Sequence, residues 1–389
     1  MKQDRGIIVN ILNRNYPPCP GITGESAAEL AAYLVGRGLL VNIITVDGEY
    51  QGGGGEVKSS GNVYRIKTFY NGKSKAMRLL SNLYEGFSMV WKSRSFSPDV
   101  TICMTDPPLL NMWAAILLRK RKWILWAMDL YPEAFAAAGL VSKGNVFYKL
   151  IDKIVLSNKP SHIISLGPYQ NDYLHQKYGR DIASTILPCG VYNAADQNHV
   201  DFPSWAKDRD KIYLGYCGNL GEAHSLEFLM SVIDCLDPTR FRLILALYGA
   251  GGAKLAAYAE GKQGVEMVSS VKRGELKYID IHLASLKNEW VNVCVPSKTV
   301  SSVCSHATFI YCGSAESDNW ELLKGAGWLI PVMDDVKRSA QEVLTRISKQ
   351  DIVEKKGLAS ELAKVLLCKK EAAFKSIYEG IVEIAPRSR

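Results

Sequence analysis

The feature that most restricts the fold of this chain is an alternation of short apolar runs with helical segments, which occurs twice along the sequence. In the first half the strand-like runs are residues 6–12, 40–46, 62–67, 99–104, 123–128 and 162–166. In the second half they are residues 212–217, 241–248, 265–268, 291–295 and 308–311. Such alternation predicts parallel sheets with helices on both faces, so we expect an α/β chain with two doubly wound, Rossmann-like domains.

The length of 389 residues fits two domains. Between the two alternating halves, residues 191–211 are polar, hold a single proline and show no periodicity, which is typical of a linker. We therefore expect domains over residues 1–190 and 212–370, followed by a C-terminal helix over 371–389. Two such domains would face a central cleft, with ligands bound beyond the carboxyl ends of the strands.

Composition excludes several classes of protein. A hydrophobic content of 47% and a charged content of 22% are those of a soluble globular chain, not of a disordered or fibrous one. The nine cysteines form no Cys-x-x-Cys pair, so we expect a reducing compartment. The six histidines show no metal-ligand spacing, and we expect no metal and no resident cofactor. The N-terminus does not resemble a signal peptide, and no apolar run is long enough to span a membrane.

Charge is concentrated in the first half. Residues 1–189 hold 22 Lys and Arg against 14 Asp and Glu, whereas the rest of the chain holds 25 of each. A basic half indicates an anionic partner such as a membrane surface or a phosphorylated lipid, although a chance surface bias is an alternative. We find no nucleic-acid-binding module and expect no nucleic-acid partner.

Two loops that follow strands in the first half carry candidate site residues. The loop over residues 13–25 contains Gly24 where a helix is expected to begin, a place that favours an anionic ligand. It matches neither Gly-x-Gly-x-x-Gly nor a Walker loop, so a structural turn is an alternative. Asp129 and Glu133 follow a later strand, where a carboxylate can accept a proton from a sugar hydroxyl or cap a helix.

Three loops in the second half indicate a phosphate or nucleotide site. Gly218 and Asn219 lie in a glycine-rich turn that leads to His224, and Gly249 opens another glycine-rich turn that leads to Lys254. A third loop, Pro-Ser-Lys, places Lys298 near a helix N-terminus, where a cation is unfavourable unless an anion offsets it. For each single residue, a solvated surface or capping role is the alternative.

Taken together, these motifs resemble those of GT-B glycosyltransferases, in particular the retaining group 1 (family 4-like) bacterial enzymes that build exopolysaccharide, capsule and O-antigen. The likeness rests on four stretches in the family's order: residues 16–24, residues 126–133 (WAMDLYPE), residues 216–224 (YCGNLGEAH) and residues 295–298 (VPSK).

The resemblance implies a GT-B fold in which the first domain binds the acceptor, a polyprenyl-diphosphate-linked sugar or oligosaccharide, and the second binds a nucleotide-sugar, with UDP as the expected nucleotide. It further implies that the C-terminal helix returns to the first domain, that no metal is needed, and that the leaving diphosphate helps to take the acceptor proton. It suggests catalytic roles for Asp129 and Glu133. Donor-site roles are implied for Gly24, Gly218, Asn219, His224, Gly249, Lys254, Lys298, Ser301, Ser317, Asp318 and Asn319. Acceptor-side roles are implied for Tyr16, Thr23 and Glu25.

Two departures from the family pattern concern the donor site. The family has a ribose-binding Glu three positions after the lysine, where this chain has Ser301. The common Pro-Asn-Gly-Val-Asp at the domain boundary reads Pro-Cys-Gly-Val-Tyr at residues 188–192. An inactive relative therefore remains an alternative, as does a nucleotide-sugar 2-epimerase or a non-catalytic sugar-nucleotide-binding protein.

A segment over residues 73–94 predicts an amphipathic helix with an apolar stripe flanked by basic residues. The stripe consists of Met77, Leu80, Tyr84, Phe87 and Trp91. A second basic cluster beside a tryptophan follows at residues 119–123. This pattern suits an anionic bilayer, which predicts a cytoplasmic protein held on the inner face of the membrane, unless the stripe packs on the sheet.

Overall fold

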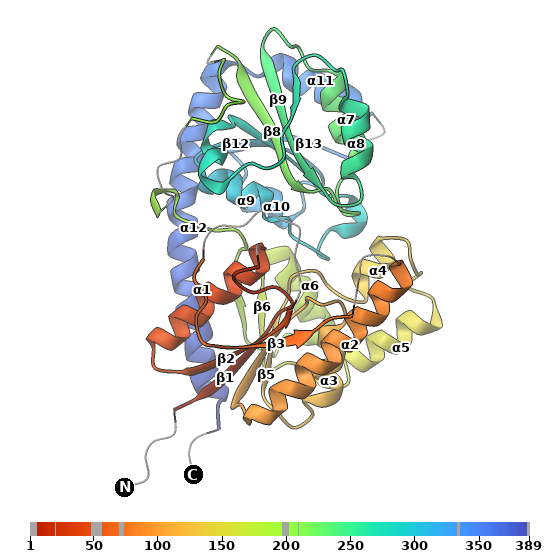
Figure 1. Ribbon diagram of the computed structural model, residues 1–389, viewed down its shortest axis with the longest axis vertical. Coiled ribbons are helices and arrows are strands. Elements are labelled where there is room, and N and C mark those ends of the chain that lie inside the picture. The colour runs from red at the N-terminus through yellow and green to blue at the C-terminus, as the bar shows by residue number, and fades with distance from the viewer. Residues whose placement is uncertain are drawn as a thin grey trace. The chain divides into compact units, whose positions relative to one another are not determined.

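The computed structural model describes residues 6–19, 21–47, 57–69, 74–196, 202–208, 210–332 and 335–386. These residues form two compact units (Figure 1). The first unit holds the described residues up to Leu187 and those from Glu371 onward, and the second holds those from Pro188 to Lys370. The glycine run at residues 52–55 lies outside the described residues.

The first unit is built on a seven-stranded sheet in the order β3-β2-β1-β4-β5-β6-β7. Every strand pair in it is parallel. The strands are β1 (Ile8–Leu12), β2 (Leu40–Asp47), β3 (Asn62–Lys67), β4 (Val100–Met104), β5 (Trp123–Trp126), β6 (His162–Ser165) and β7 (Ser184–Ile186). The residues of β4, β5 and β6 are all buried, because a parallel sheet is covered on both faces.

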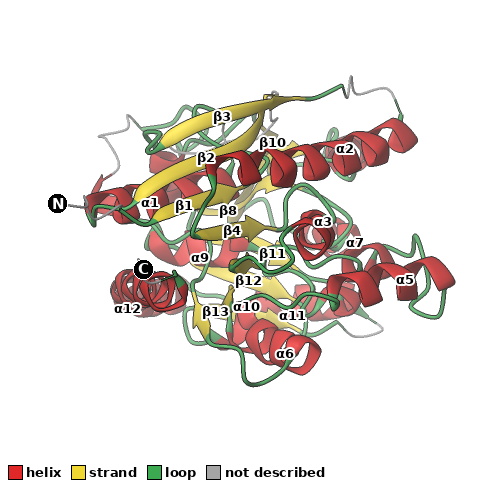
Figure 2. Ribbon diagram, turned by 90° about the horizontal axis from the view of Figure 1, so that it is seen from below, coloured by secondary structure: helices red, strands yellow, loops and turns green. Residues whose placement is uncertain are grey.

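Helices cover both faces of this sheet (Figures 1 and 2). They are α1 (Ile22–Gly36), α2 (Lys75–Ser93), α3 (Leu110–Leu117), α4 (Glu133–Ala137), α5 (Val146–Val155), α6 (Pro168–Tyr178) and the end of α12 (Lys349–Ile384), with the 3-10 turn η1 (Arg94–Phe96). The aromatic rings of Tyr33 in α1 and Phe374 in α12 lie 5.4 Å apart, so the end of α12 packs beside α1.

The second unit has a six-stranded sheet in the order β10-β9-β8-β11-β12-β13, again with every pair parallel. Its strands are β8 (Ile212–Asn219), β9 (Phe241–Tyr248), β10 (Val265–Met267), β11 (Ile281–Ser285), β12 (Thr308–Cys312) and β13 (Gly327–Ile330). The helices of this unit are α7 (Leu226–Asp234), α8 (Gly252–Ala259), α9 (Ser297–Cys304), α10 (Asp318–Glu321), α11 (Val336–Arg346) and the start of α12. Its 3-10 turns are η2 (Ala194–Asp196), η3 (Arg273–Tyr278) and η4 (Asn288–Trp290).

The expected class, two Rossmann-like parallel-sheet domains, is confirmed, but one strand prediction is wrong. The run 291–295 is not a strand, because Asn292 has a left-handed backbone with φ of 66° and the segment turns after η4. Val293 and Cys294 are buried without pairing in the sheet, whereas Val291 and Val295 are half-buried. The strand at this place is β11, which the sequence hides because a histidine, His282, interrupts its apolar run.

The expected linker, residues 191–211, packs in part on the second unit. Trp205 and Ala206 are buried and pack against Tyr213 and Ile244 of the second sheet and against Ile279. Part of the polar stretch is therefore fixed to the second unit by Trp205 and also by Phe202, whose ring lies 4.8 Å from that of Tyr278. None of the helices in the described ranges combines the length and the hydrophobicity that a membrane span requires.

Candidate functional site

A half-buried cation, Lys298, marks the carboxyl edge of the second sheet. The Lys298 Nζ atom, in the first turn of α9, donates to the main-chain oxygen of Asn219 at 3.0 Å and lies 3.1 Å from His224 Nε2. It also lies 5.2 Å from the centre of the Tyr216 ring. Asn219 ends β8 and His224 follows it, so the two post-strand motifs that the sequence singled out meet at one place.

The hydrogen bonds of His224 fix which ring nitrogen carries its proton. Nδ1 lies 2.7 Å from the main-chain oxygen of Ser285, which can only accept, so Nδ1 carries the hydrogen and Nε2 is free to accept from Lys298. Burial and the charge of Lys298 lower the pKa of His224 to about 3, which keeps the ring neutral. Burial also lowers the pKa of Lys298 to about 8.

No carboxylate pairs with Lys298 in the part of the chain that the structure describes; its recorded polar partners are a carbonyl oxygen and a neutral imidazole. A cation held in this way, at the end of a parallel sheet and in the first turn of a helix, has the surroundings of an anion site.

Gly249 is required where the next strand, β9, ends against this site. Its φ is 89°, and a Cβ atom added there would lie 1.9 Å from Asn219 Oδ1. The close approach fixes the Asn219 side chain beside the turn. Gly218 lies next to the Lys298 side chain, so the structure brings Gly218, Asn219, His224, Gly249 and Lys298 together as predicted from their loops.

Lys254 is not part of this group. It is exposed on α8, and no hydrogen bond or ion pair within the described ranges joins it to Lys298 or its neighbours. Ser301 also points elsewhere: its hydroxyl donates to the Gly190 oxygen at 3.4 Å, and its main-chain oxygen accepts from the Tyr192 hydroxyl at 3.3 Å. A small side chain at 301 thus lets residues 190–192 pack on α9.

The stretch 317–319 is buried and braces the start of α9. Asn319 Nδ2 donates to the Pro296 oxygen at 2.6 Å and to Thr299 Oγ1 at 2.9 Å. The Ser317 hydroxyl lies 3.0 Å from the Tyr311 hydroxyl, and Asp318 is only 3% exposed. These contacts support the helical turn that carries Lys298.

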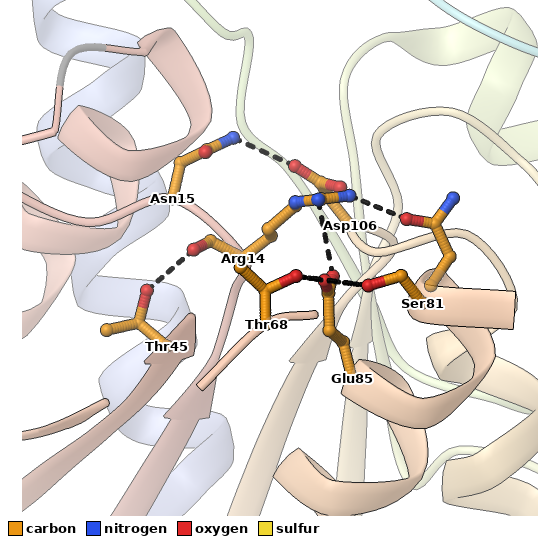
Figure 3. Close-up of polar contacts among 8 residues, drawn as sticks. Arg14, Asn15, Thr45, Thr68, Ser81, Glu85 and Asp106 are labelled. Atoms are coloured by element: carbon orange, nitrogen blue, oxygen red, sulfur yellow. Dashed lines mark hydrogen bonds and ion pairs between the residues drawn. The ribbon is translucent and has the colours of Figure 1, made fainter. Parts of the chain in front are cut away.

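A polar network occupies the carboxyl edge of the first sheet (Figure 3). Arg14, after β1, approaches Glu85 of α2 at 3.4 Å and donates to Asn82 Oδ1 at 2.6 Å. Glu85 is fully buried and accepts from the hydroxyls of Thr68 and Ser81. Asn15 Nδ2 donates to Asp106 Oδ2 at 2.9 Å, directly after β4.

The charge of Asp106 acts on Asp129. Desolvation raises the pKa of Asp129 to about 6, and the negative charge of Asp106 adds to the shift. Desolvation likewise raises the pKa of Asp106 to about 6, although the charge of Arg14 opposes it. The Asp129 side chain keeps access to solvent, so it can reach a ligand.

Glu133 does not face the carboxyl edge together with Asp129, contrary to the expectation. It is 2% exposed at the start of α4, where it accepts from Lys177 and from the Tyr173 hydroxyl at 2.9 Å. Lys177 also pairs with Asp152 at 2.7 Å. Glu133 is therefore held in a buried ion-pair cluster under α6.

The acceptor-side residues of the first loop are mostly internal. Tyr16 is fully buried, and its hydroxyl donates to the Ser60 oxygen at 2.6 Å. Glu25 is buried in α1, and Thr23 Oγ1 accepts from Asn13 Nδ2 at 3.3 Å. A Cβ at Gly24 would lie 2.9 Å from the Asn15 main chain, so Gly24 lets the loop pack on the helix.

Helix α2 has its apolar stripe outside and polar side chains inside. The five stripe residues, Met77, Leu80, Tyr84, Phe87 and Trp91, are 37–57% exposed. The buried face carries Ser81, Asn82, Glu85 and Ser93 beside Met89 and Val90. The stripe therefore does not pack on the sheet, which was the alternative to membrane contact.

The sequence reasoning missed Arg14, Glu85 and Asp106. Asp106 follows β4 just as Asp129 follows β5, so the same post-strand rule could have found it. Glu85 was missed because a sequence pattern suggests that the apolar face of a helix is the buried one, whereas α2 buries its polar face.

No protein-family model matches the chain. It is 21% identical over 280 residues to WbjE of Pseudomonas aeruginosa, a probable glycosyltransferase, and the match covers 67% of this chain and 69% of WbjE. The structure of WaaG, a glycosyltransferase involved in lipopolysaccharide biosynthesis, aligns with a TM-score of 0.63 and 14% identity over 96% of this chain and 99% of WaaG. HepE of Anabaena, solved with UDP and glucose, aligns with a TM-score of 0.63 and 12% identity over 96% of this chain and 100% of HepE.

Two parallel, Rossmann-like sheets in sequence and near-complete alignment with these structures establish the fold. The chain has the GT-B fold and resembles the group 1 glycosyltransferases, as its motifs predict.

Proposed function

We propose that this protein is a glycosyltransferase that moves a sugar from a nucleotide-sugar, with UDP as the expected nucleotide, to a glycan or polyprenyl-diphosphate-linked acceptor in bacterial surface polysaccharide synthesis. The observation that carries the proposal is the half-buried Lys298 at the carboxyl edge of the second sheet, with neutral His224 and the Asn219 turn as its neighbours. WaaG is a glycosyltransferase involved in lipopolysaccharide biosynthesis, and HepE was solved in complex with UDP and glucose. Both similarities support this assignment.

In this function the donor diphosphate binds at Lys298, whose ammonium group balances the charge of the leaving group. The acceptor oxygen forms a bond to C1 of the donor sugar while the bond from C1 to the nucleoside diphosphate breaks. Asp129 orients the acceptor hydroxyl, and Asp129 and the leaving diphosphate together take its proton, which is later released to solvent. We assign the transfer to the retaining, metal-independent class by family resemblance.

The exposed stripe of α2 supports a place for the protein on the inner face of the cytoplasmic membrane. An apolar helix face of this size in contact with water is unfavourable, and Arg78 and Lys92 on the same helix are exposed as well. The basic run 119–122, at the end of α3, is also exposed. Aromatic and basic side chains together suit a bilayer that contains anionic lipids. This surface disfavours the 2-epimerase alternative, which needs no lipid.

The donor site is tested by isothermal titration of UDP, GDP and dTDP into the wild-type protein and two lysine variants. Lys298→Ala removes charge-assisted hydrogen bonds worth about 1.5–3 kcal/mol, so we expect a 10- to 100-fold weaker Kd for the nucleotide that binds. Lys254→Ala removes the same charge from an exposed site of the same unit and should leave the Kd unchanged. Absence of nucleotide binding by the wild-type protein, or equal loss in both variants, contradicts the proposal.

Transfer itself is tested with UDP-sugars and lipid-linked sugars extracted from bacterial membranes. We expect UDP release and a heavier lipid-linked product only when both substrates are present. Conversion of UDP-N-acetylglucosamine to its 2-epimer without an acceptor would instead assign the epimerase function.

Membrane binding is tested by co-sedimentation with vesicles of phosphatidylglycerol and phosphatidylcholine. Replacing Phe87 and Trp91 by serine should weaken binding by about tenfold or more, since each large apolar side chain contributes on the order of 1.5 kcal/mol when buried in lipid. Leu358→Ser is the matched control, because Leu358 is 50% exposed on the second unit. Equal binding by the control and the double variant would contradict the assignment to α2.

A further inference from the structure

Asp106 and Asp129 are fixed as neighbours by the main chain of the first sheet. Met104 of β4 pairs in register with Trp126 of β5. Beyond this pair, the buried Thr105 hydroxyl accepts a hydrogen bond from the Met128 main-chain nitrogen at 2.9 Å. The residues that follow these two, Asp106 and Asp129, therefore leave adjacent strands together at the edge where ligands bind.

The Arg14 guanidinium, whose charge acts on Asp106, is held by side chains of α2. Both terminal nitrogens of Arg14 are engaged by α2, one with Asn82 and the other with the fully buried Glu85. Glu85 cannot lose Arg14 without becoming an unbalanced buried charge, which is strongly unfavourable. Arg14 is thereby anchored to Glu85, and the side-chain hydrogen bond recorded for Asp106 comes from the neutral amide of Asn15 (Figure 3).

Few other charges act on the two carboxyl groups. Arg14 from the loop after β1 and Arg78 from α2 favour the ionised form of Asp106, and Glu85 from α2 opposes it. The charge that acts on Asp129 is that of Asp106. Asp129 therefore responds to the charge of Asp106, whereas Asp106 responds to Arg14, Arg78 and Glu85.

We propose that Asp106 is a positioning residue for the acceptor reaction: fixed beside Asp129 by the Thr105–Met128 hydrogen bond and oriented by Asn15, it makes Asp129 a stronger proton acceptor for the sugar hydroxyl. The proposal rests on the proposed glycosyltransferase function, in which Asp129 contacts that hydroxyl. Two adjacent like charges disfavour each other, so a proton taken up by Asp129 relieves the repulsion at the moment of transfer.

The proposal is tested first without substrate, by 13C NMR titration of the aspartate carboxyl groups in protein labelled at aspartate. The resonance missing in Asp129→Asn identifies Asp129, and in the wild-type protein it should titrate near pH 6. In Asp106→Asn its midpoint should fall, by about 0.5–1 pH unit, because the neighbouring negative charge is gone. Asp172→Asn, which removes an exposed carboxylate from α6 of the same unit, should leave the midpoint unchanged. An unchanged midpoint in Asp106→Asn overturns the proposal.

The second measurement is the pH profile of kcat/KM for UDP release from the active UDP-sugar, with extracted lipid-linked sugars as acceptor. The acid limb should move to lower pH in Asp106→Asn, with a kcat/KM at least several-fold below wild type on the plateau, and should stay in place in Asp172→Asn. A merely structural role would lower activity without moving the limb. Transfer with an unmoved limb in Asp106→Asn overturns the role of Asp106 alone, whereas absence of transfer by wild type overturns the proposed function on which it rests.

Discussion

Raising the pH from 7 to 9 should weaken UDP binding by about tenfold, because Lys298 loses its proton within this range. Its pKa is lowered to about 8 by desolvation, with the neutral His224 and a main-chain oxygen as its recorded polar partners. A group with that pKa is roughly 90% charged at pH 7 and roughly 10% charged at pH 9. If only the ammonium form binds the diphosphate, the competent fraction falls about tenfold, and the apparent Kd rises by the same factor.

The measurement is isothermal titration of UDP at pH 7, 8 and 9. At pH 8 the bound diphosphate should draw Lys298 back to its charged form, so about half a proton should be taken up per UDP, which buffers of different ionisation enthalpy reveal. Lys298→Arg is the matched control, since a guanidinium stays charged throughout and ionisation of the nucleotide itself is the same for both proteins.

The reasoning is refuted if the Kd changes equally in the wild-type protein and in Lys298→Arg. It is also refuted if proton uptake at pH 8 is absent while binding persists.

Two further predictions concern stability. Glu133→Ala leaves Lys177 with Asp152 as its ion-pair partner, so it should lower the free energy of unfolding, measured by urea titration, by about 2–3 kcal/mol. This is somewhat less than the roughly 3–5 kcal/mol for a fully broken buried pair. The control Glu289→Ala, at an exposed position, should cost under about 0.5 kcal/mol in the same titration. Gly249→Ala should destabilise the second unit by more than about 1 kcal/mol and also weaken UDP binding, because its Cβ would displace the Asn219 side chain. Gly261 has a similar φ of 73° and open space around it, so Gly261→Ala measures the effect of backbone strain alone. Equal effects of the two substitutions would argue against the Asn219 contact.

Most of the fold could be predicted because buried parallel strands leave continuous apolar runs. Prediction failed where an apolar run is not a strand. Residues 291–295 are mostly apolar, and Val293 and Cys294 are buried, but the chain turns at Asn292, whereas β11 is a strand that contains His282. His282 is tolerated there since its ring lies 3.1 Å from the Leu276 oxygen and burial keeps its pKa low, at about 4. A sequence pattern holds no record of such a satisfied polar side chain.

The candidate site divides in the same way. Lys298, Asn219 and His224 were found because each lies in a loop at a strand or helix end, where backbone geometry limits the choices. Glu133 was expected at the same edge as Asp129 because both lie in the segment that follows the strand beginning at Trp123. The turn into α4 instead buries it against Lys177, a partner 44 residues away that local spacing does not reveal. Arg14 and Glu85 were missed for the same reason, since their pairing depends on how α2 lies on the sheet.

Helix α2 exposes its apolar face and buries its polar face against the first sheet, and this affects which acceptors the candidate site could contact. Tyr84 and Phe87 point away from the sheet, whereas Glu85, between them in sequence, holds Arg14 near Asp106. A helix with its side chains is about 10–12 Å across. With its outer side in lipid, α2 would act as a spacer that sets the height of the acceptor carboxyls above the bilayer. Under the proposed function, a sugar joined directly to a lipid would then come within reach of these carboxyls more readily than the far end of a long glycan.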